Sequence, residues 1–321
     1  MQLLSGRGLR FVYQVAVLII IFTVVQYLIT VGVLNQYYQI NLTSMCINII
    51  LAVSLNLING FTGQLSLGHA GFMAVGAYVS VIFTNMLGMP FIVGIIFACL
   101  AAAMAGFIIG VPTLRLRGDY LAIATLGFGE IIRVVLQNLE YLGGPAGILG
   151  ISRITSWAWL FGATVITIVV IQNIINSSYG RAIISIREDE IASELMGINT
   201  TFYKVLVFVI GAAFAGLAGA LYAHYFYIIK PETFSFLKSF DILVMVVLGG
   251  LGSTTGAVIA AVSITILTAA LQSFPAVRMI IYALILVLVM IYRPQGLMGN
   301  REFGWKNLSR IRGGKNGNSS D

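Results

Sequence analysis

Two side chains of opposite charge, Glu130 and Arg133, lie three residues apart within an apolar stretch of this 321-residue chain. On a helix this spacing places them on one face, where each neutralises the other and makes the pair tolerable in hydrocarbon. Such a pair can fix helix packing, line the path of a polar solute or take part in proton coupling. We favour the packing role, with the solute path as the second interpretation.

A second group of polar side chains lies in a glycine-rich break between two apolar runs, from residue 56 to residue 80. Irregular backbone at membrane depth is tolerated only where protein buries it or water lines it. The break therefore indicates either a solute cavity or a tight helix crossing through small residues, and we weigh the two equally. For His69 alone, a hydrogen-bonded histidine at a helix start is favoured over a ligand. Together with Glu130 and Arg133, the candidate residues of a translocation path are Asn56, Asn59, Gln64, Ser66 and His69.

The most polar segment of the chain interior is the loop 177–203. The pattern from Ser185 to Met196 predicts a short helix with one apolar face and one acidic face, ended by Gly197. An amphipathic helix that is not needed to span anything is a docking surface. Helices that lie on a membrane carry Lys and Arg on their polar face, whereas this one is mainly acidic, so a protein groove is the favoured partner.

The sequence contains no recognisable catalytic machinery. No stretch matches the phosphate-binding Gly-x-x-x-x-Gly-Lys-Ser/Thr pattern or the His-Glu-x-x-His zinc helix. The two cysteines lie in apolar runs, where a thiol behaves as a small buried hydrophobe. We therefore predict no catalytic residue, no metal and no bound cofactor. If the chain moves a solute uphill, an ion gradient or another subunit supplies the energy, and the scarcity of midplane ionisable groups disfavours the ion gradient.

Composition places these side chains in a membrane protein. Hydrophobic residues make up 59% of the chain and charged residues only 9%, against about 25% charged in soluble proteins. These values exclude a secreted disulfide scaffold, a disordered chain and an enzyme with a large extramembrane domain. The apolar runs predict an all-α, polytopic helical bundle of about ten transmembrane helices (8–10), at 11–31, 39–59, 67–88, 91–113, 119–138, 157–176, 204–228, 239–251, 254–273 and 278–292. The fifth carries two charges and the eighth is short, which makes them the weakest of the ten.

The distribution of Lys and Arg predicts the orientation, because cytoplasmic loops are enriched in both. On one side of the ten-helix arrangement lie Arg7, Arg10, Arg115, Arg117, Arg181, Arg187, Lys204, Arg293, Arg301, Lys306, Arg310, Arg312 and Lys315. The other side has only Arg153, Lys230, Lys238 and Arg278. Both termini and the loop 177–203 are therefore expected in the cytoplasm. The net charge of +7 reflects this bias rather than nucleic-acid binding, and the polar tail 300–321 is predicted to be a disordered, basic cytoplasmic segment.

Three motifs, in this order, resemble the permease subunits of branched-chain amino-acid ATP-binding-cassette (ABC) importers of the LivM type. They are NLINGFTGQLSLGHAG at 56–71, LRGDYLAIATLGFGE at 116–130 and REDEIASELMGI at 187–198. The resemblance extends over nearly the whole chain. It is specific for the family but not for the solute, because urea and amide importers use similar permeases.

This resemblance implies a non-enzymatic transporter subunit of the bacterial cytoplasmic (inner) membrane, with a permease domain at 1–299. It further implies a LivH-like sister permease, two cytoplasmic ATPase subunits that bind ATP and Mg, and a periplasmic or lipid-anchored solute-binding protein. The loop 177–203 then contains the coupling helix. Its Glu-Ala-Ala-x-x-x-Gly pattern is only partly kept, with Glu190 shifted by one position. The coupling residues implied are Arg187, Glu188, Asp189, Glu190, Ala192, Glu194 and Gly197.

Alternatives stay open from the sequence. The same type of permease could carry urea or short amides instead of leucine, isoleucine or valine. A stand-alone channel or secondary carrier is disfavoured by the acidic docking loop, and a membrane-embedded enzyme by the lack of convergent reactive groups.

Overall fold

The computed structural model of the chain describes residues 5–272 and, beyond them, residues 274, 280, 281, 284, 287, 288, 291, 292, 296 and 297. The last predicted transmembrane segment, 278–292, lies largely outside the described residues, and the predicted tail, 300–321, lies entirely outside them.

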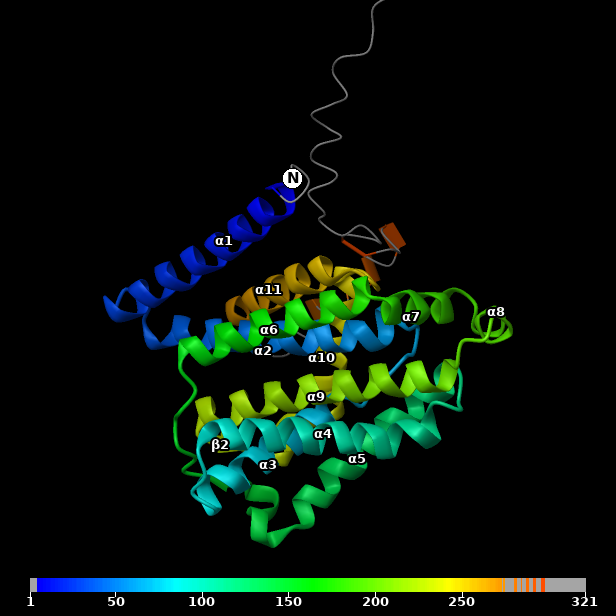
Figure 1. The fold of residues 1–321 in the computed structure, drawn as a ribbon. Helices are drawn as coiled ribbons and strands as arrows, with labels where there is room; N and C mark the ends of the chain where they lie inside the picture. Colours follow the sequence, from blue (N-terminus) through cyan, green and yellow to red (C-terminus); the bar gives the residue numbers. More distant parts are fainter. Residues whose placement is uncertain are drawn as a thin grey trace, which may run out of the picture.

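Long helices dominate the described part of the chain and lie side by side in a bundle (Figure 1). The α-helices are α1 (Ser5–Thr30), α2 (Gln36–Asn56), α3 (His69–Val81), α4 (Phe91–Thr113), α5 (Asp119–Asn138), α6 (Trp157–Asn176), α7 (Ser178–Glu188), α8 (Glu190–Leu195), α9 (Thr200–Phe226), α10 (Phe236–Gly249) and α11 (Thr254–Ala270). Two π-helical turns, η1 (Leu57–Phe61) and η2 (Ile82–Met86), extend α2 and α3, and three 3-10 turns are η3 (Glu140–Leu142), η4 (Gly144–Ala146) and η5 (Pro231–Phe234).

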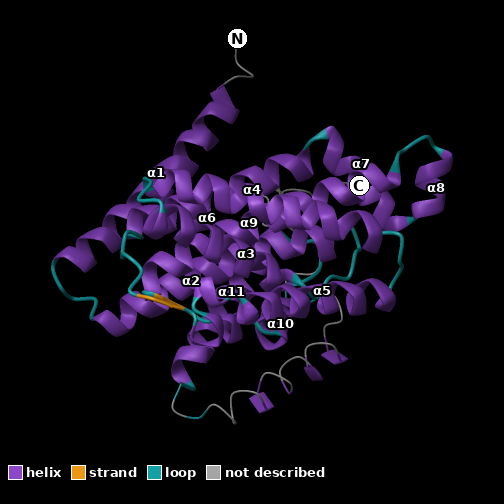
Figure 2. Cartoon of the chain, turned by 90° about the horizontal axis from the view of Figure 1, so that it is seen from below, coloured by secondary structure: helices purple, strands orange, loops and turns teal. Residues whose placement is uncertain are grey.

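Two ends of the bundle differ in character. At one end, strands β1 (Ile148–Leu149) and β2 (Ile228–Ile229) pair antiparallel. The short helices α7 and α8 lie at the other end in both views of the chain (Figures 1 and 2). The bundle therefore presents the predicted docking segment and the β1–β2 connection at opposite ends.

Apart from α7 and α8, which lie in the polar loop 177–203, the helices from α1 to α11 fall on apolar runs of the sequence. Within the described residues, five helices are long and apolar enough to cross a membrane: Gln36–Phe61, His69–Met86, Phe91–Thr113, Trp157–Asn176 and Thr200–Phe226. Ala16–Thr30 and Thr254–Ala270 are apolar but shorter. This supports a multi-pass, all-α membrane protein. The charged α5 and the 14-residue α10 are helical as predicted but fall outside these two groups.

Small residues bring three helices of the core into close contact. A Cβ atom added to Gly76 on α3 would lie 2.3 Å from the backbone of Gly216 on α9. The backbones of these two helices are therefore in direct contact there, with no room for a side chain between them. Gly219, one turn later, packs equally closely against the backbone of Met73. On its other side, Gly216 faces Ala98 and Ala102 of α4. Close backbone packing through Gly and Ala is the usual way in which membrane helices associate, as the sequence predicted for this stretch.

The predicted helix from Ser185 to Met196 is the one local element that the structure divides. Asp189 adopts an extended conformation, with φ −155° and ψ 111°, and ends α7. Its carboxylate accepts a hydrogen bond from the amide of Ala192 at 3.0 Å and so caps the start of α8. The expectation of a single helix was wrong because an aspartate can serve as an N-cap in the middle of an amphipathic pattern.

Candidate functional site

The exposed surface of α8 is apolar at three positions. Ile191, Leu195 and Met196 are 61%, 83% and 82% exposed, respectively. Ser193, on the opposite side, is buried and donates to the carbonyl of Asp189 at 2.8 Å. No described residue covers the three apolar side chains, so α8 offers a small hydrophobic contact surface at the end of the bundle (Figure 2).

Glu190 holds α8 to the rest of the chain. Its carboxylate lies 2.6 Å from Nζ of Lys204 on α9 and 3.8 Å from the guanidinium of Arg117 in the loop before α5. Lys204 is 8% exposed, so the ion pair on that side is largely shielded from solvent. Among the predicted coupling residues, Glu190 and Asp189 thus fix the position and start of α8, while Glu188, Ala192 and Glu194 are exposed.

Gly197 ends α8 with a left-handed conformation, φ +85°. Its amide donates to the carbonyl of Glu194 at 2.9 Å, and the next amide, of Ile198, donates to Ser193 at 3.1 Å. This is the glycine C-cap that the sequence predicted. A Cβ atom at this position would meet nothing within 4 Å. The glycine is therefore required by the backbone conformation and not by a lack of space.

Arg187 connects the docking segment to the membrane helices. Its Nη1 donates to the carbonyl oxygen of Gly60 in η1 at 2.7 Å. The same guanidinium packs against Gly252 between α10 and α11, and its aliphatic part packs against Gly63. Gly252 and Gly63 both have positive φ, +86° and +73°. One side chain of the cytoplasmic loop, as the sequence orients it, therefore contacts two helix breaks that lie far apart in the chain.

A cleft of about 230 Å³ lies beside this contact. It separates the segment Thr62–Gln64 from the loop before α5 and from the junction of α7 and α8. The side chains of Arg117, Arg187, Glu190 and Lys204 line it. Charged side chains therefore line the boundary between the α7–α8 junction and the helix break.

Asn56 joins the glycine-rich break that follows α2 to the irregular backbone between α10 and α11. Its Nδ2 donates to the carbonyl of Ser253 at 2.9 Å, and its Oδ1 accepts from the amide of Gly252 at 3.0 Å. The side chain of Asn59 bonds Ser66 in the same segment: its Oδ1 accepts from the amide of Ser66 at 3.1 Å and its Nδ2 donates to the carbonyl of Ser66 at 3.3 Å. The side chains of Asn56 and Asn59 are both buried. They satisfy backbone groups that irregular structure at membrane depth would otherwise leave unpaired.

His69 starts α3 and is fully buried. Its Nε2 lies 2.9 Å from the hydroxyl of Ser54 on α2. The backbone amide of Ala70 donates to the hydroxyl of Ser239 on α10 at 3.1 Å. The backbone amide of Leu67 donates to the hydroxyl of Thr125 on α5 at 3.0 Å. The start of α3 is thus tied to three helices. Within the described residues, no group of three or more His, Cys, Asp and Glu side chains is placed to hold a metal ion.

Four buried polar atoms in the same region have no hydrogen-bond partner among the described residues. They are both side-chain polar atoms of Gln64, the hydroxyl of Ser66 and Nδ1 of His69. Buried polar groups without partners are costly, by about 1–3 kcal/mol each, and they stand out beside the fully bonded Asn56 and Asn59. Gln64 also lines the charged cleft.

Glu130 and Arg133 form the predicted ion pair, with 2.7 Å between Oε2 and Nε. The other carboxylate oxygen of Glu130 accepts a hydrogen bond from the amide of Phe236, the first residue of α10, at 2.8 Å. Glu130 therefore anchors the start of α10, where a negative charge is stabilised by the helix dipole. This geometry favours the packing role of the pair.

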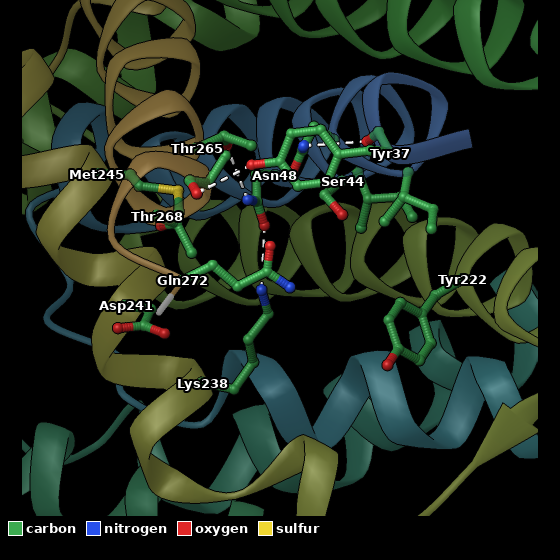
Figure 3. Close-up of a pocket in the computed structure, with 14 residues that line it drawn as sticks. Tyr37, Ser44, Asn48, Tyr222, Lys238, Asp241, Met245, Thr265, Thr268 and Gln272 are labelled. Carbon is green, nitrogen blue, oxygen red and sulfur yellow. Dashed lines mark hydrogen bonds between the residues drawn. The ribbon is translucent and has the colours of Figure 1, made fainter. Parts of the chain in front are cut away.

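The cavity in Figure 3 is lined by polar side chains that the sequence analysis did not select. It measures about 350 Å³ and lies between α2, α9, α10 and α11. A chain of hydrogen bonds crosses it: Nζ of Lys238 donates to Oδ1 of Asn48 at 3.0 Å, and Nδ2 of Asn48 donates to the hydroxyl of Thr265 at 3.0 Å. The lining residues are Tyr37, Ile40, Asn41, Ser44, Ile47, Asn48, Tyr222, Lys238, Asp241, Met245, Thr265, Thr268, Ala269 and Gln272.

None of the predicted path residues lines this cavity. The signal that could have found it is a helical spacing of polar side chains within apolar runs. Such spacing occurs at Asn41, Ser44 and Asn48 on α2 and at Lys238 and Asp241 on α10. Single polar residues in a long apolar run are inconspicuous, whereas the glycine-rich break at 60–71 draws attention by its composition.

Comparison with known proteins gives a consistent result. The model of a family described as "Branched-chain amino acid transport system / permease component" matches residues 37–290. The high-affinity branched-chain amino acid transport system permease proteins LivM of Salmonella typhimurium and Escherichia coli are each 38% identical over 291 residues, which cover 80% of this chain and 68% of theirs. The corresponding LivH protein of Salmonella typhimurium is 27% identical over 283 residues, which cover 79% and 91% of the two chains.

Proposed function

Because the chain belongs to the family of branched-chain amino-acid transport system permease components, we propose that it forms, with a sister permease, the membrane path of an ABC importer for leucine, isoleucine and valine. Members of this family are membrane permease subunits and not enzymes themselves. The single observation that carries the proposal is the match of the family over residues 37–290 together with 38% identity to LivM proteins.

The proposed setting is the bacterial inner membrane, with both termini and the loop 177–203 in the cytoplasm. The bias of Lys and Arg supports this orientation. In this orientation, α7 and α8 lie at the cytoplasmic end and the β1–β2 connection lies at the periplasmic end. About ten transmembrane helices fit the apolar runs, of which the last falls largely outside the described residues.

For the docking function, we assign the exposed apolar side chains of α8, Ile191, Leu195 and Met196, to a groove on a cytoplasmic ATPase subunit. The exposed carboxylates of Glu188 and Glu194 form the polar part of the same surface, with the small side chain of Ala192 also exposed. Asp189, Glu190 and Gly197 keep α8 in shape and in place. ATP and Mg bind the two ATPase subunits in this arrangement.

Movement of α8 reaches the membrane through Arg187. Because its guanidinium contacts both Gly60 and Gly252, closure of the ATPases displaces η1 and the α10–α11 break together. Helix breaks are suited to such displacement, since they lack continuous helical hydrogen bonding. The outcome is alternating access between the periplasmic and cytoplasmic faces.

Within the solute path, we assign Asn56, Asn59, Gln64, Ser66 and His69 to its cytoplasmic end, where they shape the break between η1 and α3. The side-chain amides of Asn56 and Asn59 are bonded within the chain, so we expect these two residues to act by positioning. Gln64, Ser66 and His69 each have a buried polar atom without a partner among the described residues and are the better candidates for transient contact with solute. Glu130 and Arg133 stabilise the packing of α5 on α10.

The test is purification in mild detergent from the native membrane, identification of the co-purifying chains, and reconstitution of the assembly with its solute-binding protein. We expect a second permease, two ATPase subunits and ATP-dependent uptake of leucine. Uptake of urea or a short amide in place of leucine would correct the solute. Recovery of the chain alone with ATP-independent flux would contradict the proposal and favour a channel or carrier.

A further inference from the structure

A cleft of about 330 Å³ lies beside the β1–β2 connection and shares no lining residue with the cavity of Figure 3. It is formed by the end of α1, the start of α2, the end of α9 and the loop that leads into α6. The described residues that line it include one cation, Arg153, and no Asp or Glu. We call it the Arg153 cleft. Its volume lies within the range of about 300–1,000 Å³ that is usual for small-molecule sites.

Arg153 is held over two aromatic rings. Its guanidinium carbon lies 4.7 Å from the ring centre of Tyr225 and 5.7 Å from that of Tyr227. Its Nη1 also donates to the hydroxyl of Tyr227 at 3.3 Å. None of the ion pairs formed by the described residues includes Arg153. Its positive charge is therefore positioned by aromatic rings, and no carboxylate of the described chain neutralises it.

The loop that carries Arg153 is fixed to the last turns of α9. The backbone amide of Ile154 donates to the carbonyl of His224 at 3.3 Å. The hydroxyl of Thr155, which is buried, donates to the carbonyl of Leu221 at 3.2 Å. Because these bonds lie on either side of the next residues of the loop and of α9, the wall of the cleft is built before any ligand arrives.

Unused hydrogen-bond donors face the same cleft. Ser156 directly precedes α6, and its side chain makes no capping hydrogen bond with that helix. The first amides of a helix have no partner within it and lie at the positive end of its dipole. The hydroxyl of Tyr225, a residue only 6% exposed, and Nε1 of Trp157 are buried without a hydrogen-bond partner among the described residues. Both residues line the cleft.

We propose that the Arg153 cleft binds the phosphodiester group of a phospholipid. A phosphate has several acceptor oxygens, so one group can neutralise Arg153 and accept from the start of α6, from Trp157 and from Tyr225. Arginine suits this role because its planar guanidinium bonds two phosphate oxygens at once.

The same cleft distinguishes between head groups. It contains no carboxylate among its described residues, so the ammonium group of phosphatidylethanolamine would have no counter-charge. The head group of phosphatidylglycerol is uncharged beyond its phosphate, and its hydroxyl groups can bond the side-chain amides of Gln26 and Gln39, which also line the cleft. The preferred ligand is therefore an anionic phospholipid without an amine.

The position of the cleft matches a lipid head group. Arg153 is one of only four Lys and Arg residues that the sequence places on the periplasmic side, and Trp and Tyr are enriched where a membrane meets water. The flanking helix α1 lies at the outside of the bundle (Figure 1). Farther from this end, α1 and α6 expose apolar side chains such as Val24 and Ile166, which acyl chains can cover.

A bound phosphate would also connect α1 to the rest of the bundle. Among the described ring contacts of α1 is that of Phe22 with Phe161 of α6, whose ring centres are 5.6 Å apart. The cleft lies between the same two helices and is lined by residues of α2 and α9 as well. A ligand that binds all four helices stabilises the folded protein in proportion to its affinity and concentration. Thermal unfolding therefore reports on binding.

The test uses the protein purified together with its co-purifying subunits and washed in detergent to remove lipid. It is titrated with dioleoyl phosphatidylglycerol, dioleoyl phosphatidylethanolamine, dioleoylglycerol, which lacks the phosphate, and inorganic phosphate. Thermal unfolding and native mass spectrometry measure affinity. We expect phosphatidylglycerol to bind about tenfold more tightly than dioleoylglycerol and about threefold more tightly than phosphatidylethanolamine. Inorganic phosphate alone should not raise the unfolding temperature.

Three variants locate the site. Arg153→Gln removes the charge and should weaken binding of phosphatidylglycerol about tenfold. Trp157→Phe and Tyr225→Phe keep an aromatic ring and remove one donor, and each should weaken binding about threefold. The matched control is Lys230→Gln, which removes an exposed positive charge at the same end of the bundle but outside the cleft. It should bind the lipid like the wild type.

Unfolding temperatures without lipid show whether each variant folds, and the two aromatic variants test the site even if Arg153→Gln does not. Wild-type affinity for phosphatidylglycerol in every folded cleft variant would overturn the proposal. Equal stabilisation by inorganic phosphate would also overturn it, because the site would then bind a free anion. Loss of a co-purifying subunit from Arg153→Gln, with lipid binding unchanged, would assign the cleft to a protein contact instead.

Discussion

The side-chain oxygen of Asn56 accepts a hydrogen bond from the backbone amide of Gly252 at 3.0 Å, across 196 positions of sequence. The side-chain Nδ2 of Asn56 donates to the carbonyl of Ser253 at 2.9 Å. A residue at the end of α2 thus holds the irregular backbone between α10 and α11. Arg187 contacts Gly60 and Gly252 on either side of this joint and so connects it to the loop 177–203.

Asn56→Ala should lower the stability of the protein by about 1–2 kcal/mol, since two hydrogen bonds between membrane helices are lost at roughly 0.6 kcal/mol or more each. Uptake should fall more than stability implies, because the two breaks would no longer move together. Thermal unfolding in detergent and leucine uptake measure the two effects. Asn138→Ala is a suitable control, as Asn138 is exposed and bonds only within its own helix. If Asn56→Ala and Asn138→Ala had equal effects on stability and uptake, Asn56 would not hold the two helix breaks together.

Arg187→Lys keeps the positive charge but lacks the planar guanidinium that bonds Gly60 while packing on Gly252. We expect ATP hydrolysis to continue and the amount of leucine transported per ATP to fall severalfold. The matched change is Arg181→Lys, because the guanidinium of Arg181 bonds the nearby Ser178 on an exposed surface. A normal ratio of transport to hydrolysis in Arg187→Lys would show that the contact does not transmit movement.

Replacing both Leu195 and Met196 by Asp should abolish co-purification of the ATPase subunits, because two negative charges would have to be buried in the docking groove. Stability should hardly change, since both side chains are more than 80% exposed in this chain. Tyr141→Asp alters another side chain of high exposure, 77%, outside α7 and α8. If the ATPases remain bound to the Leu195 and Met196 variant, docking must involve a different surface.

At Gly197, the conformation itself is the requirement. Asn tolerates the left-handed region best, Ala is strained by about 1 kcal/mol, and a β-branched residue by more. We therefore expect uptake to decrease in the order Gly197→Asn, Gly197→Ala, Gly197→Val, while the amount of protein in the membrane stays constant. Quantified immunoblots and uptake assays check this order. Normal uptake with valine would count against a coupling role of α8.

Glu130→Ala should reduce stability by about 1–2 kcal/mol, because the amide of Phe236 loses its acceptor and Arg133 its counter-charge. Glu130→Gln keeps the acceptor and should lose less. Neither change should make uptake sensitive to a proton gradient. Proteoliposomes with and without an imposed pH difference provide the measurement, and a gradient-dependent difference between wild type and Glu130→Gln would restore the proton-coupling interpretation.

Much of the architecture could be predicted from the sequence because hydrocarbon imposes length and apolarity on each helix. The helices α2, α4, α6 and α9 fall where uninterrupted apolar runs occur. Gly197 ended its helix as predicted, and Glu130 met Arg133. These features depend on residues close together in sequence.

Long-range partners could not be predicted in the same way. Nothing near Glu130 indicates that its second oxygen binds the amide of Phe236, and nothing near Asn48 points to Lys238 and Thr265. Each of these contacts depends on which helices become neighbours. The division at Asp189 was missed for a local reason, since its capping conformation competes with a helical pattern of nearly equal quality.

The glycine contact between α3 and α9 has a kinetic consequence. Where Gly76 and Gly216 bring two backbones together, neither helix can slide along the other without first separating from it. Helices α3, α4 and α9 should therefore behave as one slow-exchanging unit in deuterium-labelling experiments, while amides near Gly252 exchange faster. In each transport cycle this unit would stay rigid while α2, α10 and α11 rotate relative to it.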